Sequence, residues 1–146
     1  MFRPHEYSSE ERNELVHQCI EGIISPDADE GEIRWWCSAI PETLRHILWK
    51  QKVIVRRLEE IDIDLERLDA KFRLRYVHLD DNKGSITERK DFAVAMKQAR
   101  SKDYARLLRE RAKLNELWNS YEADKINVNE KSFMIRKIAN FESDRV

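Results

Sequence analysis

The sequence has 146 residues, of which 38% are charged, and its 27 Lys and Arg against 28 Asp and Glu give a formal net charge of -1. Only three Gly and three Pro occur, too few for a many-turned β-sandwich or a Gly-rich nucleotide-binding fold. No apolar run approaches the roughly 18 residues that span a membrane, and residues 1–6 lack the apolar core of a secretory signal. We therefore expect an all-α, cytoplasmic protein with no membrane partner.

The near-zero net charge hides a strong asymmetry along the chain. Residues 1–44 hold 3 basic and 10 acidic side chains, net -7, whereas residues 45–113 hold 19 basic and 12 acidic, net +7; the remainder is -1. A basic block beside an acidic one is typical of a polyanion-binding surface next to a segment that avoids or competes with the polyanion. The alternative is that the two blocks pair with each other in the fold.

The first predicted segment, residues 1–40, is acidic and helical. Ser8 or Ser9 followed by Glu11 resembles a capping box, and apolar residues from Leu15 to Ile24 recur at helical spacing until Ser25-Pro26 ends the helix. Residues 27–32 contain turn formers without a large apolar side chain and predict an exposed acidic loop. Residues 33–40 predict a short helix before Pro41, which suits the first turn of a new helix.

A long helical hairpin is predicted over residues 41–126. Residues 41–79 contain no Gly or Pro after Pro41 itself, and the turn formers at 80–84 separate them from a second capping box at 85–88. The next helix should then fold back antiparallel onto the first. The predicted apolar seam of the first helix is Leu44, Leu48, Val55, Leu58, Ile61, Leu65, Leu68, Phe72 and Leu79.

Residues 127–146 predict a C-terminal amphipathic helix. Asn127 and Asn129 mark a point where the chain either breaks or continues as one helix, and the sequence leaves both open. The predicted fold is therefore all-α: a long, coiled-coil-like antiparallel helical hairpin with a small N-terminal helical cap and a C-terminal amphipathic helix.

The sequence offers little that supports catalysis. Its four histidines are scattered, with no pairing that would close a metal site, and no phosphate loop, nucleophile elbow or kinase motif occurs. We expect a protein that is not an enzyme and needs no cofactor.

The basic residues of the hairpin are the stronger signal. Many cations at separations comparable to phosphate spacing suit a nucleic-acid backbone, although a solvated helical face with intrahelical ion pairs would have a similar composition. The predicted DNA-binding residues are Lys50, Lys52, Arg56, Arg57, Lys71, Arg73, Arg75, Lys83, Arg89 and Lys90.

A rival hypothesis makes the acidic segment the active surface of a helical protein-interaction module, such as a phage-encoded inhibitor or adaptor that binds a host protein. Its candidate residues are Asp27, Asp29, Glu30 and Glu32, with Trp35 and Trp36 beside them. Aromatics at this density either pack the N-terminal helix onto the hairpin or anchor a partner.

The organisation resembles phage recombination mediators of the UvsY type over about residues 43–142. The matching stretches are the basic residues 49–60, residues 70–76 before the turn, residues 87–90 after it, and the closing helix 132–142. The resemblance implies a ring-forming protein that binds single-stranded DNA and works with a RecA-like recombinase or a single-strand-binding protein. It also implies an oligomer interface at Phe133, Ile135, Ile138 and Phe141. The acidic segment 1–40 has no counterpart in that pattern.

Overall fold

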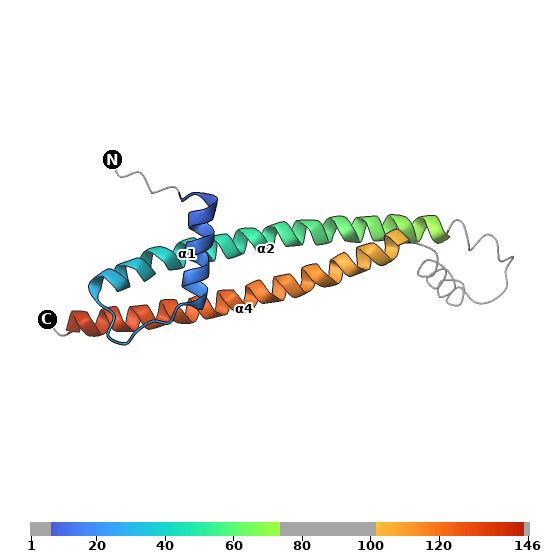
Figure 1. Ribbon diagram of the computed structural model, residues 1–146. Coiled ribbons are helices and arrows are strands. Elements are labelled where there is room, and N and C mark those ends of the chain that lie inside the picture. The colour runs from blue at the N-terminus through green and yellow to red at the C-terminus, as the bar shows by residue number, and fades with distance from the viewer. Residues whose placement is uncertain (1–6, 74–101, 145–146) are drawn as a thin grey trace, which may run out of the picture. The chain divides into compact units, whose positions relative to one another are not determined.

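A computed structural model describes residues 7–73 and 102–144 of the chain, with side chains to residue 140. These residues form three helices and no strand: α1 (Ser9–Glu21), α2 (Glu30–Phe72) and α4 (Lys102–Asp144) (Figure 1). The predicted all-α helical hairpin with an N-terminal helix is confirmed. The predicted turn at 80–84 and its capping box lie outside the described residues. No helix in the described ranges has an apolar stretch long enough to cross a membrane.

α1 begins where its capping residue predicts. The Ser8 hydroxyl accepts a hydrogen bond from the Glu11 amide at 3.2 Å, which satisfies one of the free N–H groups at the helix start. The helix ends at Glu21, with Gly22 as its C-cap residue, and so earlier than the predicted end at Ser25-Pro26. A Cβ at Gly22 would lie 2.5 Å from the Gln18 carbonyl oxygen and 3.1 Å from the Trp36 ring, so the backbone carbonyl first, and the ring in addition, leave no room for a side chain here.

The C-terminal carbonyls of α1 have a partner on α4. Lys131 Nζ donates hydrogen bonds to the carbonyl oxygens of Cys19, at 2.9 Å, and of Ile20. The same ammonium group lies 5.7 Å from the centroid of the Trp36 ring. A cation at this position satisfies orphan carbonyls and complements the negative end of the helix dipole, so Lys131 joins α1 to the rest of the fold.

The predicted helix boundary at Pro41 is wrong, because Pro41 lies inside α2. The helix starts after Asp29, whose Oδ1 accepts the Glu32 amide at 2.8 Å, and continues through Pro41 without interruption. Proline removes one backbone hydrogen bond from the helix interior, which opposes continuation. The adjacent Ala39, Ile40 and Thr43 are buried, and their packing offsets that cost. The predicted boundary at residue 40 therefore lies inside one helix.

α4 settles the question left open at Asn127 and Asn129. Both residues lie within the uninterrupted helix, and Val128 between them is fully buried. The predicted C-terminal amphipathic helix is consequently the last part of α4 and not a separate element. Burial of Val128 favours the helical conformation over the local turn preference of asparagine.

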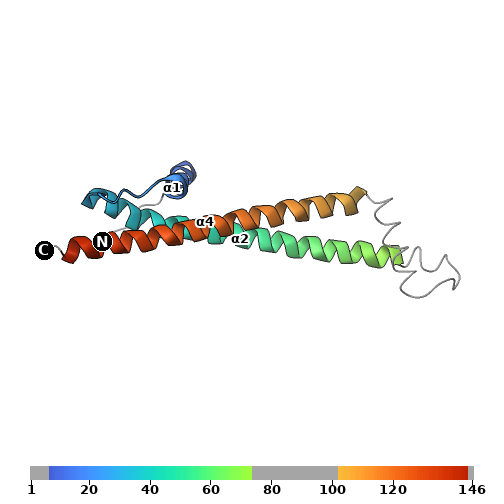
Figure 2. The ribbon, with the colours of Figure 1, turned by 90° about the horizontal axis from the view of Figure 1, so that it is seen from below.

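The chain forms two compact units, and α2 and α4 contribute to both. The first unit comprises residues 1–52 and 119–146, and the second comprises residues 53–118. Within each unit the α2 and α4 segments run in opposite directions (Figure 2). The core of the first unit is formed by Leu15, Cys19, Ile24, Trp36, Ala39, Ile40, Ile47, Val128 and Ile135. In the second unit Ile54, Ile61 and Leu107 are buried.

The core-facing side of α2 differs from the predicted seam over its first half. The buried positions are Thr43, Ile47, Gln51 and Ile54. The predicted Leu44 packs against the core, whereas the predicted Leu48 is 48% exposed and Val55 is also exposed. The observed face is displaced by one residue, a rotation of about 100° about the helix axis. From Ile61 to Phe72 the predicted and observed faces agree, since Ile61 is fully buried and Leu65, Leu68 and Phe72 are half-buried; the predicted Leu79 lies outside the described residues.

Candidate nucleic-acid interface

The first half of α2 contains a continuous basic stretch. Between Glu42 and Glu59 the sequence has no acidic residue, and it carries five cations: Arg45, Lys50, Lys52, Arg56 and Arg57. All five lie within α2, which fixes their order along one helix. A stretch of net charge +5 is a local source of positive potential that attracts polyanions.

Within the first unit, Arg45, Trp49 and Lys52 form one outward-facing surface, which we call the Trp49 surface. Their spacing of four and three residues places them on one side of the helix, about 10 Å long at 1.5 Å per residue. Thr43 and Ile47 are buried on the opposite side. Trp49 is 57% exposed and Lys52 is also exposed, so the indole ring lies in solvent between two cations.

The immediate surroundings of Trp49 are positive. Lys50 Nζ lies 5.1 Å from the centroid of the Trp49 ring, and the His46 ring lies 6.5 Å away in a tilted arrangement. Arg45 Nη1 bonds to Glu42 Oε1 at 2.7 Å, while the Arg45 side chain stays largely in solvent. Lys52 has no ion-pair partner among the residues that the structure describes.

The pKa of His46 is lowered by burial and by the positive charges near it. Partial burial lowers the pKa of His46 below its ordinary value, and the charges of Lys50 and of Arg12 on α1 lower it further. The imidazole is therefore kept neutral at pH values where an unfolded chain already binds a proton.

The stability of the fold should depend on the protonation of His46. In the unfolded chain the histidine pKa is about 6.5. As the pH falls below this value, the unfolded chain takes up a proton that the folded chain resists, so folding stability decreases. In His46→Gln the loss of stability between pH 7.5 and pH 5.5 should be smaller than in the parent protein. Urea unfolding at both pH values measures this; an equal loss in both proteins would contradict it.

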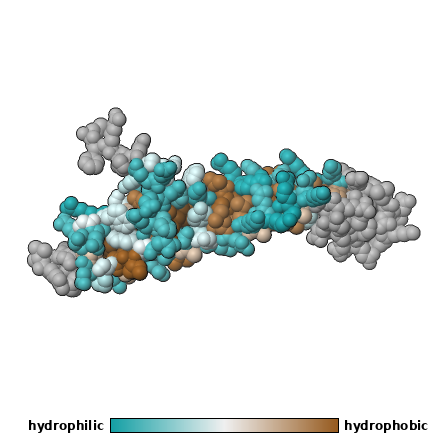
Figure 3. All heavy atoms as spheres, in the orientation of Figure 1, coloured by the Kyte–Doolittle hydropathy of each residue, from teal (hydrophilic) through white to brown (hydrophobic). Residues whose placement is uncertain are grey.

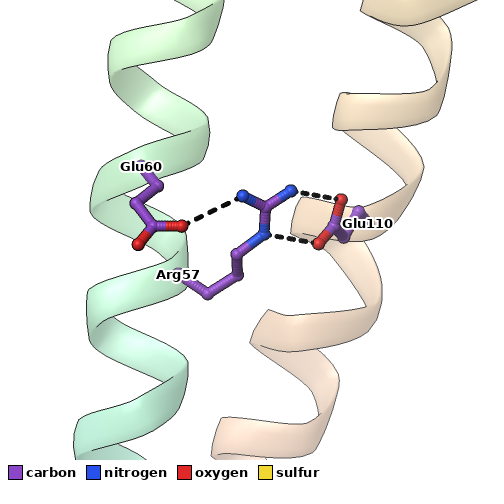
Figure 4. Close-up of polar contacts among 3 residues, drawn as sticks. All are labelled: Arg57, Glu60 and Glu110. Carbon is purple, nitrogen blue, oxygen red and sulfur yellow. Dashed lines mark hydrogen bonds and ion pairs between the residues drawn. The ribbon is translucent and has the colours of Figure 1, made fainter.

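Arg57 belongs to the predicted set but is committed to the fold of the second unit. Its Nε and Nη2 donate to the two carboxylate oxygens of Glu110 at 2.7 and 3.0 Å, and its Nη1 donates to Glu60 at 3.1 Å (Figure 4). The bidentate pair raises the pKa of Arg57 and lowers the pKa of Glu110. Arg57 therefore joins α2 to α4 and is not free to bind a phosphate.

The remaining predicted cations of the second unit are dispersed. Arg56 and Lys71 are exposed, and Arg73 lies 3.7 Å from Asp69. Six carboxylates, at Glu59, Glu60, Asp62, Asp64, Glu66 and Asp69, separate Arg56 from Lys71 along α2. Asp62 also contacts Arg111 of α4 at 3.6 Å. In the described part of the second unit, oppositely charged residues of α2 and α4 therefore pair in both directions, Arg57 with Glu110 and Asp62 with Arg111, and no continuous basic surface forms.

Four predicted DNA-binding residues lie outside the described part of the chain: Arg75, Lys83, Arg89 and Lys90. Their contribution to DNA binding remains a prediction.

The residues of the rival hypothesis have local structural roles. Asp29 caps α2, and Glu30 forms an ion pair with Arg34 at 2.6 Å. Trp36 is 6% exposed and packs edge-on against Trp35, with ring centroids 4.8 Å apart. Asp27 and Glu32 are exposed. The tryptophan pair packs mainly inside the first unit, so it offers a partner protein little surface.

The predicted oligomer interface is divided between the core and the surface. Ile135 is 3% exposed within the core of the first unit, and Ile138 packs against that core. Phe133 is 58% exposed on another side of α4, and the side chain of Phe141 lies outside the described residues. Ile135 and Ile138 therefore stabilise the monomer.

Sequence reasoning left Arg45 out of the predicted DNA-binding residues, and it considered Trp49 only as a residue that packs the helices together or anchors a subunit or protein partner. Two signals were available: the absence of acidic residues between 42 and 59, and the spacing of Arg45, Trp49 and Lys52. Neither signal was used, because the predicted core face was centred on Leu48. That choice places Arg45, Trp49 and Lys52 beside the core face of the helix and not opposite it.

The described residues contain no cluster of three or more His, Cys, Asp or Glu side chains placed to hold a metal ion. In comparisons with known proteins, no family model matches the chain, and neither a curated protein nor a solved structure is significantly similar to it.

Proposed function

We propose that this protein is a non-enzymatic protein that binds single-stranded DNA without sequence specificity, and that the Trp49 surface holds the strand. The observation that carries the proposal is an indole ring 57% exposed on the face of α2 opposite the core, between Arg45 and Lys52. Removing an indole ring from water stabilises a fold, so large aromatic rings are usually buried. A ring that stays exposed on a helix surface is typical of a residue that contacts a partner.

The chemistry of the surface favours an unpaired strand over a duplex. A base stacks on an aromatic face only when it is free of its own base stack, and such stacking contributes roughly 1–3 kcal/mol per base. Cations on either side of the ring contact the phosphates that flank the stacked base. The sequence contains no homeodomain, zinc-finger or RNP motif for reading bases, which supports binding without sequence preference.

The resemblance to recombination mediators of the UvsY type supports a specific cellular role. We propose that the protein holds single-stranded DNA while a RecA-like recombinase loads and a single-strand-binding protein is displaced. Two of the three residues of the Trp49 surface, Trp49 and Lys52, lie in the first of the basic stretches on which that resemblance rests, residues 49–60.

The salt dependence of binding tests the proposal directly. Fluorescence anisotropy of a labelled oligo-dT strand, titrated with protein at several salt concentrations, gives the slope of log K against log salt, which is about -0.7 for each phosphate neutralised on a single strand. Removing two cations in Arg45→Ala/Lys52→Ala should make this slope less steep by about 1.4 and weaken binding about tenfold at low salt.

A control variant of equal charge change separates the surface from net charge. Lys113 and Arg136 are exposed elsewhere on α4, so Lys113→Ala/Arg136→Ala should leave the slope nearly unchanged. Equal slopes for the parent and Arg45→Ala/Lys52→Ala would refute the site. Binding of a duplex as tight as that of oligo-dT would refute the preference for single strands.

A further inference from the structure

The outer side of α4 in the first unit carries large apolar side chains that no described element covers. Ile126 is 57% exposed and Phe133 is 58% exposed, and Met134 beside them is also exposed. Val128 and Ile135, two residues further along from Ile126 and Phe133, are buried in the core on the opposite side of the helix. On the face drawn in Figure 3, hydrophobic surface gathers over the C-terminal part of α4.

Charged residues alternate with these apolar residues in a regular order. Ile126, Glu130, Phe133 and Lys137 are spaced by four, three and four residues, so they lie along one side of the helix. Glu130 and Lys137 are both exposed, and Lys137 Nζ lies 4.6 Å from the centroid of the Phe133 ring. We call this row, together with Met134, the outer face of α4.

We propose that the outer face of α4 binds the same face of a second copy of this chain, with the two helices antiparallel. When Phe133 of one copy lies against Met134 of the other, Glu130 lies opposite Lys137 of the second copy, and Lys137 lies opposite its Glu130. The face is therefore complementary to itself in charge as well as apolar, as the interface of a two-fold symmetric dimer must be.

The same charges disfavour other arrangements of two copies. Parallel helices in register would place Glu130 against Glu130 and Lys137 against Lys137, which is repulsive at both ends. A two-fold interface uses the same surface on both copies and closes after two chains, whereas a ring needs two different surfaces on each chain. The dimer is thus distinct from the ring that the family resemblance implies, and it does not depend on the Trp49 surface.

Charge exchange tests the pairing. Because Cys37 is exposed, all proteins carry Cys37→Ser to prevent disulfide-linked dimers. Sedimentation equilibrium of the full chain should show a monomer–dimer equilibrium. Glu130→Lys and Lys137→Glu each convert two attractive contacts into repulsive ones, so each should weaken the dimer about tenfold or more. An equimolar mixture of the two variants should recover the association, because every cross-pair in the mixed dimer is again opposite in charge.

Two further variants separate the interface from general effects. Phe133→Ser should weaken the dimer, whereas Leu117→Ser, at another exposed apolar residue of α4, should not. Glu116→Lys provides the same charge change at an exposed position outside the outer face. Circular dichroism confirms that each variant keeps its helix content. A monomeric parent protein, an assembly larger than a dimer, or single charge variants that associate as strongly as the parent would each overturn the proposal.

Discussion

Replacing Trp36 with alanine should destabilise the fold by about 3–5 kcal/mol, the usual cost of truncating a buried aromatic side chain. Trp36 is 6% exposed and belongs to the core of the first unit. Its ring occupies the space that a side chain at position 22 would need, packs edge-on against Trp35 and lies beneath the ammonium group of Lys131. The substitution therefore leaves a cavity where α1 meets α2 and removes the aromatic partner of Lys131.

Urea unfolding followed by far-UV circular dichroism measures this loss, and Trp49→Ala is the matched control. The control makes the same chemical change at an exposed position and should alter the free energy of unfolding by no more than about 0.5 kcal/mol. Comparable destabilisation by the two substitutions would show that the two tryptophans do not have separate roles, one in the core and one at the surface.

Trp49→Ala should instead reduce the affinity for single-stranded DNA about tenfold or more. Stacking of one base on an aromatic ring contributes roughly 1–3 kcal/mol, and about 1.4 kcal/mol corresponds to a factor of ten. Trp49→Phe keeps an aromatic face and should retain most of the affinity. Anisotropy titrations with oligo-dT at low salt measure all three proteins.

Two controls show whether a loss of affinity in Trp49→Ala comes from the missing ring or from a loss of fold. The unfolding curve of Trp49→Ala should match the parent, which excludes loss of fold. Quenching of tryptophan fluorescence by oligo-dT should be strongest in the parent and largely lost in Trp49→Ala, because the other three tryptophans are less exposed: Trp36 is buried, and Trp35 and Trp118 are half-buried. Undiminished affinity in Trp49→Ala would remove the aromatic ring from the proposed interface and leave only the cations.

Local signals in the sequence were sufficient for the elements whose stability is local. The capping serine predicts the start of α1 because its hydroxyl needs only an amide three residues away. The scarcity of Gly and Pro together with helical spacing predicts the long helices. Prediction was less successful where a helix-breaking residue is opposed by packing. The predicted helix boundary at Pro41 was wrong, and a break at Asn127 and Asn129 was left undecided. All three residues lie inside continuous helices because their neighbours are buried.

The candidate site was predicted only in part. The basic character of α2 near Lys50 and Lys52 is visible in the sequence, but the separation of Arg57 from the exposed cations is not. Arg57 lies 53 residues from Glu110, and only the fold of the second unit brings the two side chains together. Likewise, Phe133 and Ile135 look alike in an apolar series, and only packing places one in solvent and the other in the core.

The sequence by itself determined the class of fold, the direction of the charge asymmetry and the absence of acidic residues around Trp49. The tertiary structure decided which side of α2 is buried. Apolar residues occupy more than one side of this helix, so periodicity permits either Leu48 or Ile47 in the core. Packing of Trp36 and Ile40 against α1 selects Ile47, and that choice turns Arg45, Trp49 and Lys52 towards solvent, where the proposed binding surface is accessible.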